Sequence, residues 1–245
     1  MSTRLHLNSA RVPRTPDGSA GEWAGFFDGA AELVAKDWPP LLWWAMFGPD
    51  DLAEARIADT EDAGTEEHAE LLSDWGEATY PYLVVDQRTA VARLRARREE
   101  LTGRIGARYA PVYDAFTALV DARFGPFVLL RTEALAGGGD SGVRTHFEET
   151  LADLARLDAG RTTAAGGRLD ALVADFHRWR HTDPVRLLSG AGPGWPDEGL
   201  RERLDAAEDR PSSGGRRGRT AAVGWLAALV LLGAAALAVL AATTS

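Results

Sequence analysis

Two spacings of hydrophobic positions occur along the chain, and each predicts one type of element. Thr3–Leu7 alternates polar and apolar residues, while Tyr80–Asp86 and Pro126–Thr132 concentrate β-branched and aromatic residues, so three strands are expected. Elsewhere apolar residues recur every three or four positions, which predicts helices. The longest of these helices are expected at residues 89–105, 110–123, 145–157 and 167–181.

Shorter helical patterns fill the first third of the chain. Helices are expected over Trp23–Ala35 and over the stretches DDLAEARIA and TEEHAELLSDW. Together these elements predict an α+β domain over residues 1–188 that is mostly helical, with a small sheet of about three strands.

The most apolar stretch lies at residues 221–242, which contain no charged residue and no proline. A helix of this length crosses a hydrocarbon core of about 30 Å, and the alternative is a buried helix of a soluble domain. Arg216, Arg217 and Arg219 precede the stretch, so the positive-inside rule places its N-terminal side in the cytoplasm. The first residues show no signal peptide. We therefore expect a tail-anchored, single-pass protein of the cell membrane with a cytoplasmic N-terminal domain.

Between the domain and this span, residues 189–220 are rich in Gly, Pro and Ser and contain few apolar residues. Such a segment buries too little surface to offset the entropy of ordering it. It is predicted to be a flexible linker, interrupted by a short charged helix, LRERLDAAE.

Charge and composition exclude several classes of function. The chain contains no cysteine, which excludes disulfides, iron–sulfur clusters and thiol nucleophiles. All 36 acidic residues lie at or before Asp209 with 23 of the 27 basic residues, so this part has a formal charge of −13. Because such a field repels phosphate backbones, we expect no nucleic-acid partner. The four arginines that follow Asp209 suit anionic lipid headgroups instead.

A pair of histidines is the candidate metal site. His177 and His181 stand four residues apart on a predicted helix, so both imidazoles can point to one side. A zinc protease would have glutamate after the first histidine, whereas this chain has Arg178. The alternative is a pair of surface histidines near a helix end. No cofactor is predicted.

Three other residues are candidates for binding. The stretch WPPLLWWAMF holds Trp43 and Trp44, which at helical spacing face different directions, so one of them is expected at a boundary and within reach of a partner. Core packing is the alternative for both. Arg98 is placed on the apolar seam of the helix at 89–105, where it would extend its charge to water, pair with a carboxylate or hold an anion.

Two stretches, MSTRLHL at the start and PPLLWWAMF at Pro39–Phe47, resemble those of a loosely defined set of uncharacterised bacterial proteins, often actinobacterial. Those proteins open with an M-x-x-R strand and then carry a P-x-L-W helix. The resemblance covers about the first 50 residues and implies no activity or site residue.

Two hypotheses about function follow. The first is a non-catalytic module, held at the membrane by residues 221–242, that binds a protein or a small ligand. The second is a small metal-dependent hydrolase that uses His177, His181 and a carboxylate. Small residues four apart in the apolar stretch, such as Gly224 and Ala228, also predict weak homodimerisation through that helix.

Overall fold

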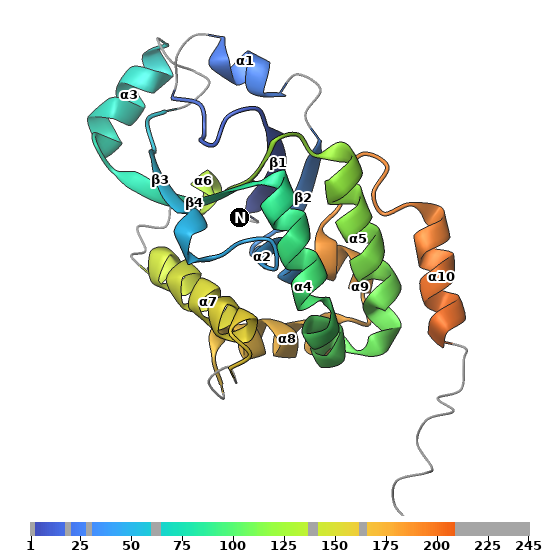
Figure 1. Cartoon of the computed structure of the whole chain (residues 1–245). Helices are drawn as coiled ribbons and strands as arrows, with labels where there is room; N and C mark the ends of the chain where they lie inside the picture. The colour runs from blue at the N-terminus through green and yellow to red at the C-terminus, as the bar shows by residue number, and fades with distance from the viewer. Residues whose placement is uncertain are drawn as a thin grey trace, which may run out of the picture. The chain divides into compact units, whose positions relative to one another are not determined.

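One antiparallel sheet organises the domain (Figure 1). A computed structural model of the chain describes residues 3–17, 21–27, 31–59, 65–136, 142–161 and 166–208. Within these residues five strands pair in the order β2-β1-β5-β4-β3, and every neighbouring pair is antiparallel. The strands are β1 Arg4–Ala10, β2 Glu32–Lys36, β3 Leu52–Arg56, β4 Thr79–Asp86 and β5 Phe127–Arg131.

Helices account for most of the remaining described chain, so the protein has an α+β fold that is mostly helical, as predicted. In Figure 1, α1 and α3 lie at one end of the picture, whereas α7 and α8 lie at the other. The helices are α1 Glu22–Phe27, α2 Leu41–Trp44, α3 Glu66–Trp75, α4 Gln87–Ile105, α5 Ala110–Arg123, α6 Glu133–Ala136, α7 Gly142–Asp158, α8 Arg168–Trp179, α9 Pro184–Ser189 and α10 Glu198–Glu208.

The prediction of helix was wrong in two places, and both belong to the sheet. Trp23–Ala35 divides into α1 and strand β2, and DDLAEARIA forms strand β3. Strand β2 pairs with β1, and β3 pairs with β4, over five residue pairs each. Ladder hydrogen bonds and cross-strand packing outweigh the local helical preference of these Ala- and Glu-rich segments.

The two faces of the sheet build two cores of different size. Because side chains alternate along a strand, Leu5 and Leu7 of β1 face the main core, while Ala10 faces the other side. The main core takes apolar residues from α2, α4, α5, α7, α8, α9 and α10. The smaller core joins residues of the opposite face to two aromatic residues of α1; its buried members are Ala10, Trp23, Phe26, Ala55, Tyr80, Tyr82 and Leu129.

Side-chain caps fix where the helices start. The carboxylate of Asp86 accepts a hydrogen bond of 2.9 Å from the Thr89 amide, which satisfies one of the free amides at the start of α4. The hydroxyl and amide of Thr89 lower the pKa of this carboxyl. The hydroxyl of Thr65 caps α3 in the same way, with a distance of 3.1 Å to the His68 amide.

The segment after α9 belongs to the domain, which corrects the predicted linker. Ala191 exchanges two backbone hydrogen bonds with Val34 of strand β2, of 2.7 and 3.0 Å. The close approach of Ala191 to strand β2 requires glycine at the preceding position. A Cβ on Gly190, where φ is +71°, would lie 2.6 Å from the Trp43 ring. Downstream, Trp195 is 6% exposed and Leu200 is fully buried.

The predicted short helix is present as α10, but the flexibility expected of the linker is wrong over residues 189–204, which pack on the sheet and helices. Residues 209–220 and the apolar stretch 221–242 lie outside the described residues. Within the described residues, no helix combines the length and the hydrophobicity needed to cross a membrane.

The packing of α10 makes a testable prediction. Changing Leu200→Ala should lower the free energy of unfolding by about 2–5 kcal/mol, because it opens a cavity in the core. The matched change Leu72→Ala, at a side chain that is 43% exposed, should cost less than about 1 kcal/mol. Urea denaturation of the detergent-solubilised chain measures both. An equal effect of the two changes would show that α10 does not contribute to the core.

Candidate functional site

The predicted aromatic binding residues lie in the core. Trp43 and Trp44 are both 0% exposed, so neither stands at the boundary where one of them was expected. Their indole nitrogens donate to backbone carbonyls, Trp43 to Ser189 at 2.9 Å and Trp44 to Pro39 at 3.1 Å. Buried indoles with satisfied nitrogens are packing residues, and they present no surface to a partner.

Arg98 points to the surface. Its side chain is 44% exposed and donates two hydrogen bonds to Asp114, of 2.5 and 2.7 Å. Hydrogen bonding to this carboxylate raises the pKa of Arg98. The seam position between Leu94 and Leu101 is filled by the preceding residue, Arg97.

Arg97 is 0% exposed, and its guanidinium holds three parts of the chain together. Its Nε and Nη2 donate to the two carboxylate oxygens of Asp158, at the end of α7, over 2.8 and 2.6 Å. Its Nη1 donates to the carbonyls of Ala45 and Phe47, just after α2, over 2.9 and 2.8 Å. Because a buried charge is tolerated only when it is paired and hydrogen-bonded, this arginine is structural.

The predicted metal pair is not assembled. Helix α8 ends at Trp179, so His181 lies beyond the helix and loses the expected spacing to His177. The Nδ1 of His177 lies 3.0 Å from Arg180 Nη1, and its Nε2 lies 2.9 Å from the Arg104 carbonyl. Because arginine can only donate, Nδ1 of His177 accepts from Arg180 and Nε2 donates to the Arg104 carbonyl. Both ring nitrogens of His177 are therefore engaged. Across the described parts of the chain, no group of three or more potential ligands is placed to hold a metal ion.

Two adjoining cavities lie between α7 and α8. The larger has a volume of about 470 Å³, and the smaller has about 180 Å³. Arg168 and Ala171 line both cavities, so the two form one groove, which we call the α7–α8 groove. Its size falls within the range of about 300–1,000 Å³ that is typical of small-molecule sites.

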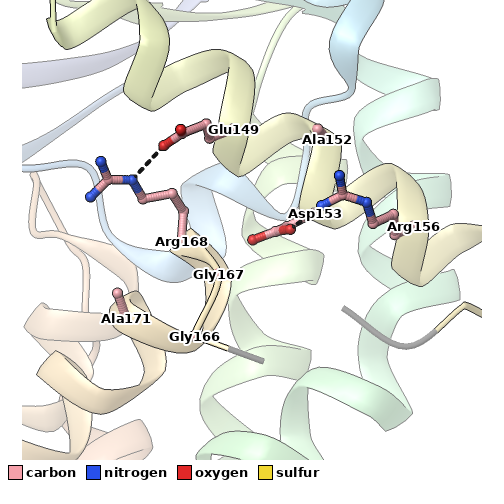
Figure 2. Close-up of a pocket in the computed structure, with 8 residues that line it drawn as sticks. All are labelled: Glu149, Ala152, Asp153, Arg156, Gly166, Gly167, Arg168 and Ala171. Carbon is pink, nitrogen blue, oxygen red and sulfur yellow. Dashed lines mark hydrogen bonds and ion pairs between the residues drawn. The ribbon is translucent and has the colours of Figure 1, made fainter. Parts of the chain in front are cut away.

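The larger cavity is lined by charges of both signs (Figure 2). Glu149 accepts a hydrogen bond of 2.7 Å from Arg168 Nε, which spans the gap from α8 to α7. Asp153 accepts one of 2.7 Å from Arg156 and also caps α8 by accepting from the Leu169 amide at 3.2 Å. The two carboxylates therefore differ in role: Asp153 is buried and structural, whereas Glu149 is half exposed.

The smaller cavity has an aromatic wall. Trp38 and His146 contribute to its lining, and their rings meet edge to face with centroids 4.9 Å apart. Trp38 also packs against Phe147 and Trp44, which fixes the orientation of its indole. Asp175 adds a carboxylate at this end. The groove thus combines exposed charges of both signs with a packed aromatic surface.

A second polar cluster lies on the sheet face opposite the main core. His6 Nδ1 is 2.6 Å from Glu32 Oε1, and the amide of Asn8 donates to the same oxygen over 3.4 Å. Asn8 is 1% exposed, and its Oδ1 accepts no hydrogen bond from the described residues. Sequence reasoning missed this cluster because strand pairing alone brings β1 and β2 together.

Comparison with protein-family models, curated proteins and solved structures gave no significant match. The groove and the chain's own composition therefore carry the information about function.

The burial of Arg97 makes a prediction for stability. Changing Arg97→Met should lower the free energy of unfolding by about 3 kcal/mol, because two buried carbonyls and Asp158 lose their donor. The neighbouring change Arg98→Met removes an exposed ion pair and should cost less than about 1 kcal/mol. Thermal and urea denaturation measure both variants. A larger loss of unfolding free energy in the Arg98 variant would show that Arg97 is not the structural arginine.

Proposed function

We propose that this protein is a membrane-attached binding module and that its α7–α8 groove takes a zwitterionic ligand of the amino-acid or short-peptide type. One observation carries the proposal: the Glu149–Arg168 ion pair is exposed and stands where the two cavities meet.

This ion pair can exchange partners at low cost. The side chains of Arg168 and Glu149 are 40% and 50% exposed, and exposed pairs contribute only about 0–1 kcal/mol. A ligand carboxylate can replace Glu149 on Arg168, and a ligand ammonium can then pair with Glu149. The two guanidinium edges of Arg168 also suit a carboxylate, which they bind in a planar, bidentate manner.

The overall charge of the domain disfavours an anionic ligand. A formal charge of −13 up to Asp209 repels anions at a distance, whereas a zwitterion meets no such barrier. The apolar part of the ligand would lie in the smaller cavity against Trp38 and Leu172, where an aromatic or aliphatic side chain removes surface from water.

Binding of free amino acids tests the groove. Phenylalanine or leucine at ten times its dissociation constant should stabilise the wild-type chain by about 1.4 kcal/mol, because the ligand binds the folded state alone. The N-acetyl and amide derivatives of the same amino acids should bind at least about tenfold more weakly, since each lacks one charge. Thermal-shift measurements and isothermal titration calorimetry report both effects.

Matched variants complete this test. Arg168→Gln and Glu149→Gln should abolish the difference between the amino acids and their derivatives. Arg144→Gln, which removes two exposed ion pairs of α7 outside the lining of the two cavities, should leave this difference unchanged. Equal binding to wild type and Arg168→Gln would eliminate the groove as the site.

Attachment to the membrane is the second part of the proposal. Its support is the charge-free stretch 221–242 with Arg216, Arg217 and Arg219 directly before it.

Deletion of residues 216–245 should move the protein from the membrane pellet to the soluble fraction in a folded state. Ultracentrifugation of cell lysates, followed by circular dichroism of the released protein, checks this outcome. Digestion of the domain by protease added outside intact cells would contradict the cytoplasmic orientation. A truncated form that stays in the pellet would contradict the anchor.

A further inference from the structure

The corner between α8 and α9 carries an exposed tryptophan. Trp179 ends α8 and is 52% exposed, the highest value among the large hydrophobic side chains that the structure describes. Leu187 of α9, at 37%, is also among the exposed ones. An exposed indole is unfavourable in water but suits the headgroup region of a bilayer, where its ring is buried and its nitrogen stays hydrated.

The chain around this tryptophan is rich in arginine. Residues 177–188 contain Arg178, Arg180 and Arg186 but a single acid, Asp183. Asp183 is engaged as the N-cap of α9, where it accepts from the Arg186 amide at 3.1 Å. The pair between Arg178 and Asp175 is long, at 3.7 Å, and both side chains are more than 60% exposed. The corner is therefore cationic on a domain whose net charge is strongly negative.

Helix α10, which precedes the apolar stretch in the chain, contacts this corner. Arg201 of α10 lies 3.9 Å from Asp183, so the last helix of the domain starts against the same corner. Residues 209–220 then separate α10 from the stretch at 221–242. If residues 221–242 span the bilayer, these twelve residues hold the end of α10 within about 43 Å of the span even when they are fully extended.

We propose that the α8–α9 corner is a lipid contact, in which Trp179 enters the headgroup region and Arg178, Arg180 and Arg186 bind anionic headgroups. The proposal rests on the membrane attachment proposed above. Each arginine near an anionic surface strengthens binding by about fivefold, and the indole adds to this. The corner would convert a loose tether into a fixed orientation of the domain.

A single spin label tests the contact in the full chain. Because the sequence has no cysteine, His181→Cys and Leu72→Cys each create one labelling site, both exposed, on the corner and on α3. The labelled chains are reconstituted in nanodiscs of phosphatidylcholine alone or with phosphatidylglycerol. At position 181, accessibility to a water-soluble paramagnetic reagent should fall at least threefold in the anionic discs, and at position 72 it should not change.

Substitutions distinguish lipid from protein contacts. Trp179→Ser with Arg178→Gln and Arg180→Gln should restore full accessibility at position 181, whereas Arg95→Gln, an exposed paired arginine on α4, should not. Equal accessibility in neutral and anionic discs would overturn the proposal. A fall in accessibility at position 181 that depends on the number of chains per disc would also overturn the proposal, because it would indicate contact with a second copy of the chain.

Failure of the anchor would give a different result. If residues 221–242 do not span the bilayer, the full chain stays outside the nanodiscs and can be mixed directly with vesicles. Sedimentation with phosphatidylglycerol vesicles, reduced at least tenfold by the triple substitution, would then support the corner alone. Absence of binding to these vesicles would overturn it.

Discussion

The buried guanidinium of Arg97 is the constraint on which the arrangement of the helices depends. A charge that is 0% exposed must have all its main partners in place at once, so α4, the chain after α2 and the end of α7 cannot separate independently. Nearby, Arg93 of α4 donates to the Met46 carbonyl and pairs with Asp51, whose carboxyl has a pKa raised by burial. Helix α4 is thus joined to the same segment by two arginines.

The position of α7 determines the groove. Asp158 anchors one end of α7 to Arg97, and Asp153, five residues earlier, caps the start of α8. The wall that carries Glu149 and the wall that carries Arg168 are therefore held together by contacts that include the buried side chains of Arg97 and Asp153. Preorganisation of this kind reduces the entropy lost when a ligand binds.

Helix α8 has a different role at each end. Its first turns contribute Arg168, Ala171 and Leu172 to the groove, and its last residue is the exposed Trp179. If both proposals hold, occupancy of the groove and contact with the membrane act on one rigid element of twelve residues. A ligand that shifts α8 would then change how the domain meets the bilayer, and the bilayer would change the affinity for the ligand by the same factor.

Strong local patterns in the sequence predicted the long helices and strands β1, β4 and β5, and with them the α+β class. Strands β2 and β3 were missed because only their pairing with β1 and β4 favours the extended state. The seam of α4 was placed correctly except that the buried arginine is Arg97 and not Arg98. The groove itself could not be predicted from the sequence. Its charged residues lie on helices whose orientation is set by packing of the core.

The bridge between Ala191 and Val34 has a practical consequence for how the domain is isolated. Strand β2 stands at the edge of the sheet, and an uncovered edge offers its free amides and carbonyls to another chain. The segment at 190–195 occupies part of that edge, while Trp195 covers apolar surface beside it. A protein cut at residue 188, the boundary that composition suggests, would expose a strand edge next to bare core. Such a fragment would aggregate through β2, although it would still contain every strand of the sheet.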